Sequence, residues 1–89
     1  MTRLEILNAI LDERYEQKIS WNQDHLWGFG DCSSPDVAMI VKAGVLTEEV
    51  GEVMQAVLDA GPEKSTQDPA VRRELIQVAA VAWAILEGM

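Results

Sequence analysis

Residues 75–86 read Leu75-Ile76-Gln77-Val78-Ala79-Ala80-Val81-Ala82-Trp83-Ala84-Ile85-Leu86, and this stretch decides the fold of the chain. Every residue in it except Gln77 is apolar, and a helix that is apolar on all sides has to be buried on all sides. Two further helices in a chain of 89 residues can hardly cover such a helix completely. We therefore expect one all-α domain over residues 1–89, completed by oligomerisation to a homodimer or homotetramer with Trp83 as a candidate interface anchor. The alternative is that the other helices cover most of this surface and the rest stays exposed.

Turn and capping signals divide the chain into three main helices. Asp68-Pro69 is a capping residue followed by proline, and it predicts that the last helix runs from there to about residue 87. The same signal at Ser34-Pro35-Asp36 predicts a middle helix from residue 35 to about residue 60, where Gly61-Pro62 ends it; Gly44 is compatible with a break inside it. Apolar spacing and a Thr2/Glu5 capping box predict a first helix over residues 2–18. The expected architecture is an antiparallel helical bundle.

The segment Ser20–Ser34 between the first two helices is predicted to be a long loop. It contains Trp21 and Trp27 and shows no sustained hydrophobic period. Loops of this length are uncommon in compact domains and are often functional, although short helical turns inside the segment are an alternative. For Trp27 we expect a place in the core or at an interface.

Composition and charge exclude several classes of protein. A net charge of -8 argues against a nucleic-acid binder, which needs a basic footprint. One cysteine, Cys32, and one histidine, His25, form neither a disulfide nor a structural zinc site, which fits a reducing compartment. No signal-peptide core and no segment of membrane-spanning length is evident. We expect a cytoplasmic protein with no membrane partner, whose partners are cations or complexes of a cation with a substrate.

Four carboxylates are the candidate functional residues: Glu48, Glu49 and Glu52 in the middle helix and Glu74 in the last. Side chains three or four residues apart share a helix face, so the first three repel one another there. Apolar residues surround this cluster, and acids at the boundary of a core need a cation; oxygen ligands suit Mg²⁺ or Mn²⁺. The alternative is a solvated acidic helix face, with Glu74 favoured by the dipole of its helix.

In these residues the chain resembles the MazG-like all-α nucleoside triphosphate pyrophosphohydrolases, and the segment Glu13–Gln17 followed by Trp21 is similar to the first-helix pattern of their short members of phage or cassette type. Their signature is E-x-x-E on one helix and E-x-x-D on the next, and it is similar to Glu49–Glu52 and Glu74–Gln77 here. The resemblance implies Mg²⁺-dependent hydrolysis of a (deoxy)nucleoside triphosphate to the monophosphate and pyrophosphate, an activity of the house-cleaning type. It implies that Glu49, Glu52 and Glu74 are metal ligands and that Glu48 binds a further ion or acts as a base.

Gln77 departs from this signature, which has aspartate at the same place. Its amide oxygen is a candidate metal ligand without a carboxylate's charge, and the alternative is a buried amide that forms hydrogen bonds across a subunit interface. The competing function is therefore a non-catalytic nucleotide- or metal-binding module, or an oligomeric interaction module without a ligand.

Three residues are candidates for binding the nucleotide substrate. Lys42 lies two turns before Glu49 on about the same helix face and can meet a phosphate; the alternative is an exposed lysine. Trp21 can stack on a base, the alternative being a place in the core or at an interface. Gln17, on the face of the first helix that leads to Trp21, can read a base edge.

Overall fold

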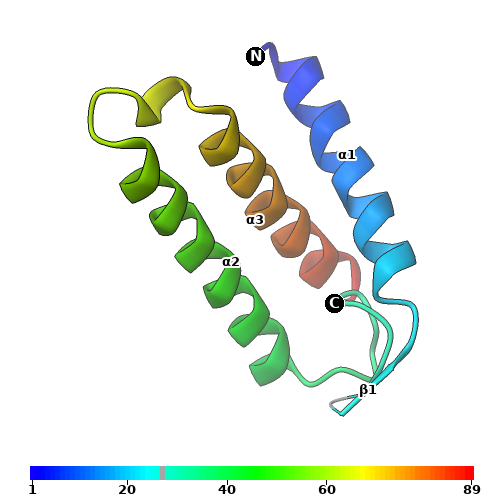
Figure 1. The fold of residues 1–89 in the computed structure, drawn as a ribbon. Coiled ribbons are helices and arrows are strands. Elements are labelled where there is room, and N and C mark those ends of the chain that lie inside the picture. The colour runs from blue at the N-terminus through cyan, green and yellow to red at the C-terminus, as the bar shows by residue number, and fades with distance from the viewer. Residues whose placement is uncertain (27) are drawn as a thin grey trace.

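The computed structural model describes residues 1–26 and 28–89, and it confirms an all-α fold (Figure 1). Trp27, for which a core or interface position was expected, lies outside the described residues. Two short strands form an antiparallel hairpin in the predicted loop, with Asp24 opposite Phe29. The elements are the helices α1 (Arg3–Ser20), α2 (Met39–Ala60) and α3 (Pro69–Glu87), the 3-10 turn η1 (Ser65–Gln67), and the strands β1 (Asp24–His25) and β2 (Gly28–Phe29).

The three helices form a single layer with α3 in the middle (Figure 1). Both α1 and α2 pack against α3, and among the described elements α1 and α2 do not pack against each other. The chain runs in the same direction along α1 and α3 and in the opposite direction along α2 (Figure 1). Because α1 and α2 do not pack against each other, α3 is flanked by one helix on each side and the layer has two faces.

The ends of α1 and α3 follow the capping signals in the sequence. Thr2 and Glu5 form the predicted capping box, with each side chain bonded to the other residue's backbone N–H. The carboxylate of Asp68 accepts hydrogen bonds from the backbone N–H groups of Ala70 and Val71 at the start of α3. Local side-chain chemistry is therefore sufficient to place these two helix starts.

The predicted start of the middle helix at residue 35 is wrong, because α2 begins at Met39. The Ser34 hydroxyl accepts a hydrogen bond from the backbone N–H of Asp36 at 3.2 Å, and the Ser34 carbonyl accepts one from Val37. These bonds close a turn that occupies the would-be first turn of the helix. From Met39 onward α2 continues to Ala60 without a break at Gly44, so the break considered there is absent.

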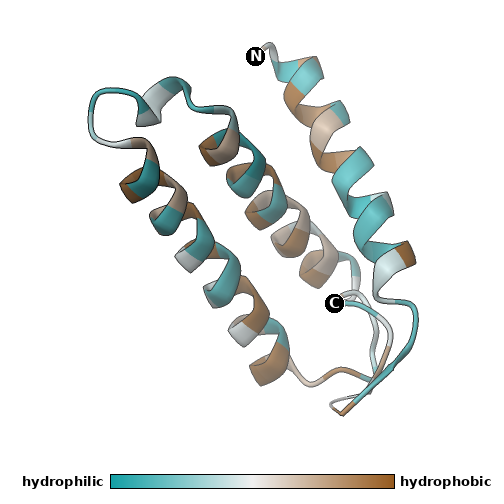
Figure 2. Ribbon diagram, in the orientation of Figure 1, coloured by the Kyte–Doolittle hydropathy of each residue, from teal (hydrophilic) through white to brown (hydrophobic). Residues whose placement is uncertain are grey.

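The hydrophobic core of one chain is small. No large side chain is fully buried among the described residues, and α3 is not covered on all sides, since Leu75, Trp83 and Leu86 are exposed. Figure 2 shows that apolar and hydrophilic residues alternate along α1 and α2, whereas the second half of α3 is mostly apolar. None of the described helices is both long and apolar enough to cross a membrane. The buried apolar residues are Val37, Val71, Ala80, Val81 and Ala84.

An ion-pair network centred on Arg14 attaches the loop to the helices. Arg14 is only 6% exposed, and its guanidinium donates hydrogen bonds to the carboxylates of Asp31 in the loop and Glu87 at the end of α3. Burial alone raises the pKa of Asp31, but hydrogen bonds from Ser33 and Arg14 outweigh it and hold that pKa below its usual range. The network therefore holds Asp31 and its neighbours against the C-terminal ends of α1 and α3.

Candidate metal centre

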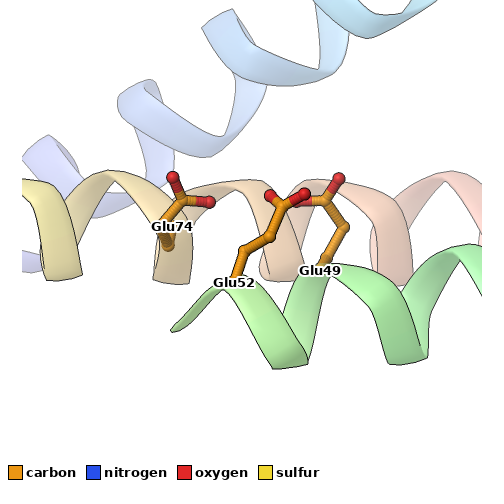
Figure 3. A group of neighbouring side chains, drawn as sticks. All are labelled: Glu49, Glu52 and Glu74. Carbon is orange, nitrogen blue, oxygen red and sulfur yellow. The ribbon is translucent and has the colours of Figure 1, made fainter. Parts of the chain in front are cut away.

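Three of the four predicted carboxylates meet between α2 and α3. Glu49 and Glu52 rise from successive turns of α2, and Glu74 faces them from α3 (Figure 3). One oxygen from each carboxylate lies within 4.8 Å of the other two. Glu49 and Glu74 are half-buried and Glu52 is exposed, so the cluster opens to solvent on one side. The fold thus brings acids of two helices together.

No ion pair of the described residues involves a carboxylate of this cluster. Partial burial and the neighbouring carboxylates, Glu52 first, raise the pKa of Glu49 from 4.5 to about 7. The pKa of Glu74 is also raised, by the smaller desolvation of its carboxyl and by Glu52, although Arg73 opposes the shift. Near neutral pH the cluster therefore either holds a proton or needs a cation.

Gln77 supplies a neutral partner to two of these carboxylates. The amide orientation of Gln77 is assigned from its neighbours. Carboxylate oxygens of Glu49 and Glu74 are acceptors, so the end of the amide that faces them is the nitrogen, which is the donor. Turned this way, the nitrogen donates hydrogen bonds to Oε2 of Glu74 at 2.9 Å and to Oε2 of Glu49 at 3.2 Å. The predicted role of Gln77 as a metal ligand would require its amide to rotate so that the oxygen faces the cluster.

A groove next to the carboxylates runs over α3 between α1 and α2. Its volume is about 210 Å³, and Gln77 and Val81 form its floor. Trp21 and Gln17 line the α1 side, and Glu49 lines the α2 side. The substrate-binding roles of Trp21 and Gln17 stay predictions. The Gln17 amide lies 3.5 Å from the backbone carbonyl of Gln77. The Trp21 ring lies against His25, with ring centroids 5.0 Å apart, so Trp21 is held at the end of the groove.

Lys42 is 4% exposed, so the alternative of an exposed lysine is wrong. Its ammonium group forms neither a hydrogen bond nor an ion pair with the residues that the structure describes. Cys32 lines the groove, and burial raises the pKa of its thiol. The positive charge of Lys42 opposes this rise, which indicates that Lys42 lies near Cys32. The ammonium nitrogen itself is not fully buried, because no fully buried side-chain nitrogen among the described residues lacks a hydrogen-bond partner.

Glu48 is the one predicted acid that the fold does not bring into the cluster. It is exposed on α2 and is not part of the group formed by the other three, although its charge contributes to the raised pKa of Glu49. Sequence reasoning had proposed it as a ligand of a further ion or as a base, and both roles stay predictions.

The groove is also lined by acidic residues and a cysteine that were not predicted as site residues: Glu13, Glu16, Asp31 and Cys32. Glu13 and Glu16 are three residues apart in α1 and share a helix face with Gln17. This spacing is a signal that could have identified them. Partial burial raises the pKa of Glu13 above its ordinary value. No sequence signal identified Asp31 and Cys32, because only the Arg14 network brings their loop to the groove.

The donor set fits a small divalent cation. Two oxygens on opposite sides of a Mg²⁺ ion are about 4.2 Å apart, because Mg²⁺ holds oxygen ligands at about 2.1 Å in octahedral geometry. Neighbouring ligands of the same ion are about 3 Å apart, so the three oxygens, which lie within 4.8 Å of one another, would have to move closer together around a bound ion. With one exposed side, the site also leaves room for water or phosphate oxygens.

Comparison with protein-family models, with curated proteins and with solved structures finds no match to this chain. The chemistry of the site therefore has to be judged from its own residues. Three converging carboxylates, an adjacent groove with an aromatic end and a largely buried lysine near it can bind a cation together with a polyanion that carries an aromatic group.

Proposed function

We propose that this protein is a Mg²⁺-dependent, MazG-like pyrophosphohydrolase of cytoplasmic (deoxy)nucleoside triphosphates, of the house-cleaning type. The observation that carries the proposal is the convergence of Glu49, Glu52 and Glu74 from two helices to within 4.8 Å. These are the residues that match the family's paired motif, and Mn²⁺ is an alternative ion for the same oxygen ligands. The products are a nucleoside monophosphate and pyrophosphate.

The acidic cluster sets how the substrate enters. A carboxylate cluster repels a free triphosphate, so the substrate binds as its complex with the cation that the carboxylates hold. When bound, Mg²⁺ neutralises phosphate charge and acidifies water. Glu49, whose pKa is raised to about 7 by burial and by Glu52, is suited to exchange a proton near neutral pH.

The groove supplies the remaining contacts of this proposal. Trp21 stacks on the base at the end of the groove, and the amide of Gln17 meets a base edge. Lys42 compensates phosphate charge from α2, since an ammonium group that forms no ion pair with the described residues is stabilised by an anion. Glu13 and Glu16 line the same groove, and their charge disfavours phosphate on the α1 side.

The hydrogen bonds of Gln77 favour a second candidate, a nucleotide- or metal-binding module without turnover. A neutral amide that already bonds to Glu49 and Glu74 competes with a cation for the same carboxylate oxygens. If this competition abolishes catalysis, the chain retains binding and loses hydrolysis. Replacing the amide by the motif's carboxylate separates the two functions, as described in the Discussion.

Pyrophosphate release from a panel of ribo- and deoxynucleoside triphosphates with Mg²⁺ tests the proposed activity. We expect turnover of at least one nucleotide, its loss in Glu52→Gln, and its retention in Glu63→Gln, a matched change of an exposed glutamate outside the cluster. Turnover no greater than that of Glu52→Gln for every nucleotide would contradict the proposal.

A further inference from the structure

A line of side chains runs along the groove face of α3. Val81 and Gln77 form the floor of the groove, and Arg73 lies one further turn toward the start of the helix. Residues four apart share a helix face, so these three positions follow one another along the same face. The carboxylate cluster lies at the level of Gln77, whose amide reaches Glu49 and Glu74. Arg73 is therefore the next residue on this face beyond the cluster.

Arg73 lines a hollow that adjoins the groove. The hollow has a volume of about 290 Å³, and Glu13 and Glu16 line both the hollow and the groove. The positive charge of Arg73 opposes the rise in the pKa of Glu74, which indicates that its guanidinium lies near that carboxylate. Arg73 is exposed, and it forms neither an ion pair nor a side-chain hydrogen bond with the residues that the structure describes. Its charge is therefore available to an anion at this end of the groove.

The direction of the groove decides which part of a nucleotide meets Arg73. Trp21 directly follows α1, and α1 and α3 run in the same direction, so the aromatic end of the groove lies toward the C-terminal end of α3 (Figure 1). Arg73 is in the first half of α3, beyond the other end of the groove. A nucleotide whose base stacks on Trp21 and whose phosphates meet the cluster therefore extends its terminal phosphates toward Arg73.

The charges around the cluster favour the same arrangement. Three ionised carboxylates and one Mg²⁺ ion leave a net negative charge, which repels the outer phosphates of a triphosphate. Lys42 precedes Glu49 on the antiparallel α2, so it lies on the base side of the cluster and offsets charge on the inner phosphate (Figure 1). Arg73 lies on the other side, and its guanidinium is a planar fork that binds phosphate oxygens in pairs. It supplies positive charge where the outer phosphates need it.

We propose that Arg73 binds the two terminal phosphates of the nucleoside triphosphate, the part that leaves as pyrophosphate. The inference rests on the proposed function and adds to it a substrate-binding residue outside the carboxylate motif. Arg73 then distinguishes triphosphate and pyrophosphate from the monophosphate, because a monophosphate with its base on Trp21 ends at the cluster and does not reach Arg73.

Titration calorimetry in the presence of Mg²⁺ tests the inference with α,β-methylene deoxynucleoside triphosphates, inorganic pyrophosphate and deoxynucleoside monophosphates as probes. Arg73→Gln should raise the Kd of the first two at least about tenfold and leave that of the monophosphates within about twofold. Arg73→Lys keeps the charge without the fork, and its affinities should lie between those of the wild type and Arg73→Gln.

Arg72→Gln is the matched control, because it removes the same charge from the adjacent position. Arg72 is also exposed and borders the same hollow, but it is turned about 100° around α3, and it also lines a hollow with Leu75 on another flank of the helix. The affinities of Arg72→Gln for all probes should stay within about twofold of the wild type. Equal weakening by the two changes would overturn the inference, since net charge alone would then explain the effect.

The same titrations separate the inference from the proposed hydrolase. Weaker pyrophosphate binding in Arg73→Gln, together with a wild type that turns over no triphosphate, would support the Arg73 site and reject the hydrolase. Turnover by the wild type, with triphosphate and pyrophosphate affinities unchanged in Arg73→Gln, would reject only the Arg73 site. A wild type that binds none of the probes would overturn both, and weakening of monophosphate and pyrophosphate binding to the same extent would overturn the assignment to the terminal phosphates.

Discussion

The amide nitrogen of Gln77 lies 2.9 Å from Oε2 of Glu74, one helical turn before it on α3, and it also reaches Oε2 of Glu49 on α2. A single neutral side chain thus bridges the two helices, at the place where the motif that this segment resembles has aspartate. Whether the cluster can bind a cation depends on whether the Gln77 amide releases the two carboxylates.

Replacing Gln77 by aspartate should add a fourth carboxylate to the cluster. Without divalent cations we expect Gln77→Asp to lower the free energy of unfolding, because like charges then face one another at the cluster. Mg²⁺ affinity should rise by about tenfold or more, since an additional ionised oxygen becomes available. Calorimetric titration with Mg²⁺ measures the affinity, and pyrophosphate release from nucleotides measures turnover.

Gln67→Asp is the matched control for this change, because Gln67 is exposed on η1 outside the cluster. Its Mg²⁺ affinity should equal that of the wild type. Tighter Mg²⁺ binding with unchanged, absent turnover would support the binding module, whereas a gain in turnover would support the hydrolase. Unchanged affinity in Gln77→Asp would show that position 77 does not face the ion.

Mg²⁺ should stabilise the folded chain through Glu49, Glu52 and Glu74. A ligand that binds only the folded state adds about 2.7 kcal/mol to the free energy of unfolding at a hundred times its Kd. Thermal unfolding monitored at increasing Mg²⁺ concentration checks this, and Glu49→Gln should abolish most of the increase. A Tm of Glu49→Gln that rises as much as that of Glu63→Gln would argue against the cluster as the binding site.

The raised pKa of Glu49 predicts how stability depends on pH. The folded chain holds this proton more tightly than the unfolded chain, because the pKa is about 7 in the first and near 4.5 in the second. The contribution of this proton to the free energy of unfolding is therefore complete below pH 4.5, and it is lost as the pH rises through about 7. Urea unfolding between pH 4.5 and 8 without divalent cations should show this decline.

Glu49→Gln provides the control for the pH profile, since an amide does not titrate. The decline between pH 4.5 and 7 should become shallower in this variant, while Glu63→Gln should keep it. Mg²⁺ binding near pH 6 should also release protons, which titration in buffers of different ionisation enthalpy detects. A wild-type profile that is as shallow as that of Glu49→Gln would refute the assignment.

Asp31 should contribute more to stability than Glu87, although both accept hydrogen bonds from Arg14. The Asp31 side chain is 9% exposed and that of Glu87 is 45% exposed, so solvent screens the second pair far more. We expect Asp31→Asn to cost about 1–3 kcal/mol and Glu87→Gln less than about 1 kcal/mol. Urea unfolding of the two variants gives the comparison, and equal losses would contradict this account.

Two glycine-to-alanine changes should act in opposite directions. Gly44 lies inside α2 with open space where a Cβ would be, so Gly44→Ala should stabilise the chain by about 1 kcal/mol. Gly28 has φ +129°, and a Cβ there would lie 2.6 Å from the carbonyl oxygen of Asp36, so Gly28→Ala should destabilise the hairpin loop. Thermal unfolding measures both, and a stabilising Gly28→Ala would contradict the described loop conformation.

The sequence by itself determined the helices whose signals are local. The Thr2/Glu5 capping box and the Asp68-Pro69 cap act within one turn, and the starts of α1 and α3 follow them. Spacing along α2 likewise placed Glu49 and Glu52 on one face. At Ser34 the local signal was ambiguous, because the same side chain can cap a helix or close a turn, and the turn prevailed.

Only the tertiary structure decided which of these elements meet. That α3 lies between α1 and α2 follows from packing between residues far apart in sequence, and it brings Glu74 to Glu49 and opens the groove where Trp21 and Gln17 lie. The burial of Lys42 and the bridge formed by Gln77 depend on the same packing. Helical periodicity fixes the direction in which each side chain points, but a contact also requires the position of the neighbouring helix, which no local signal carries.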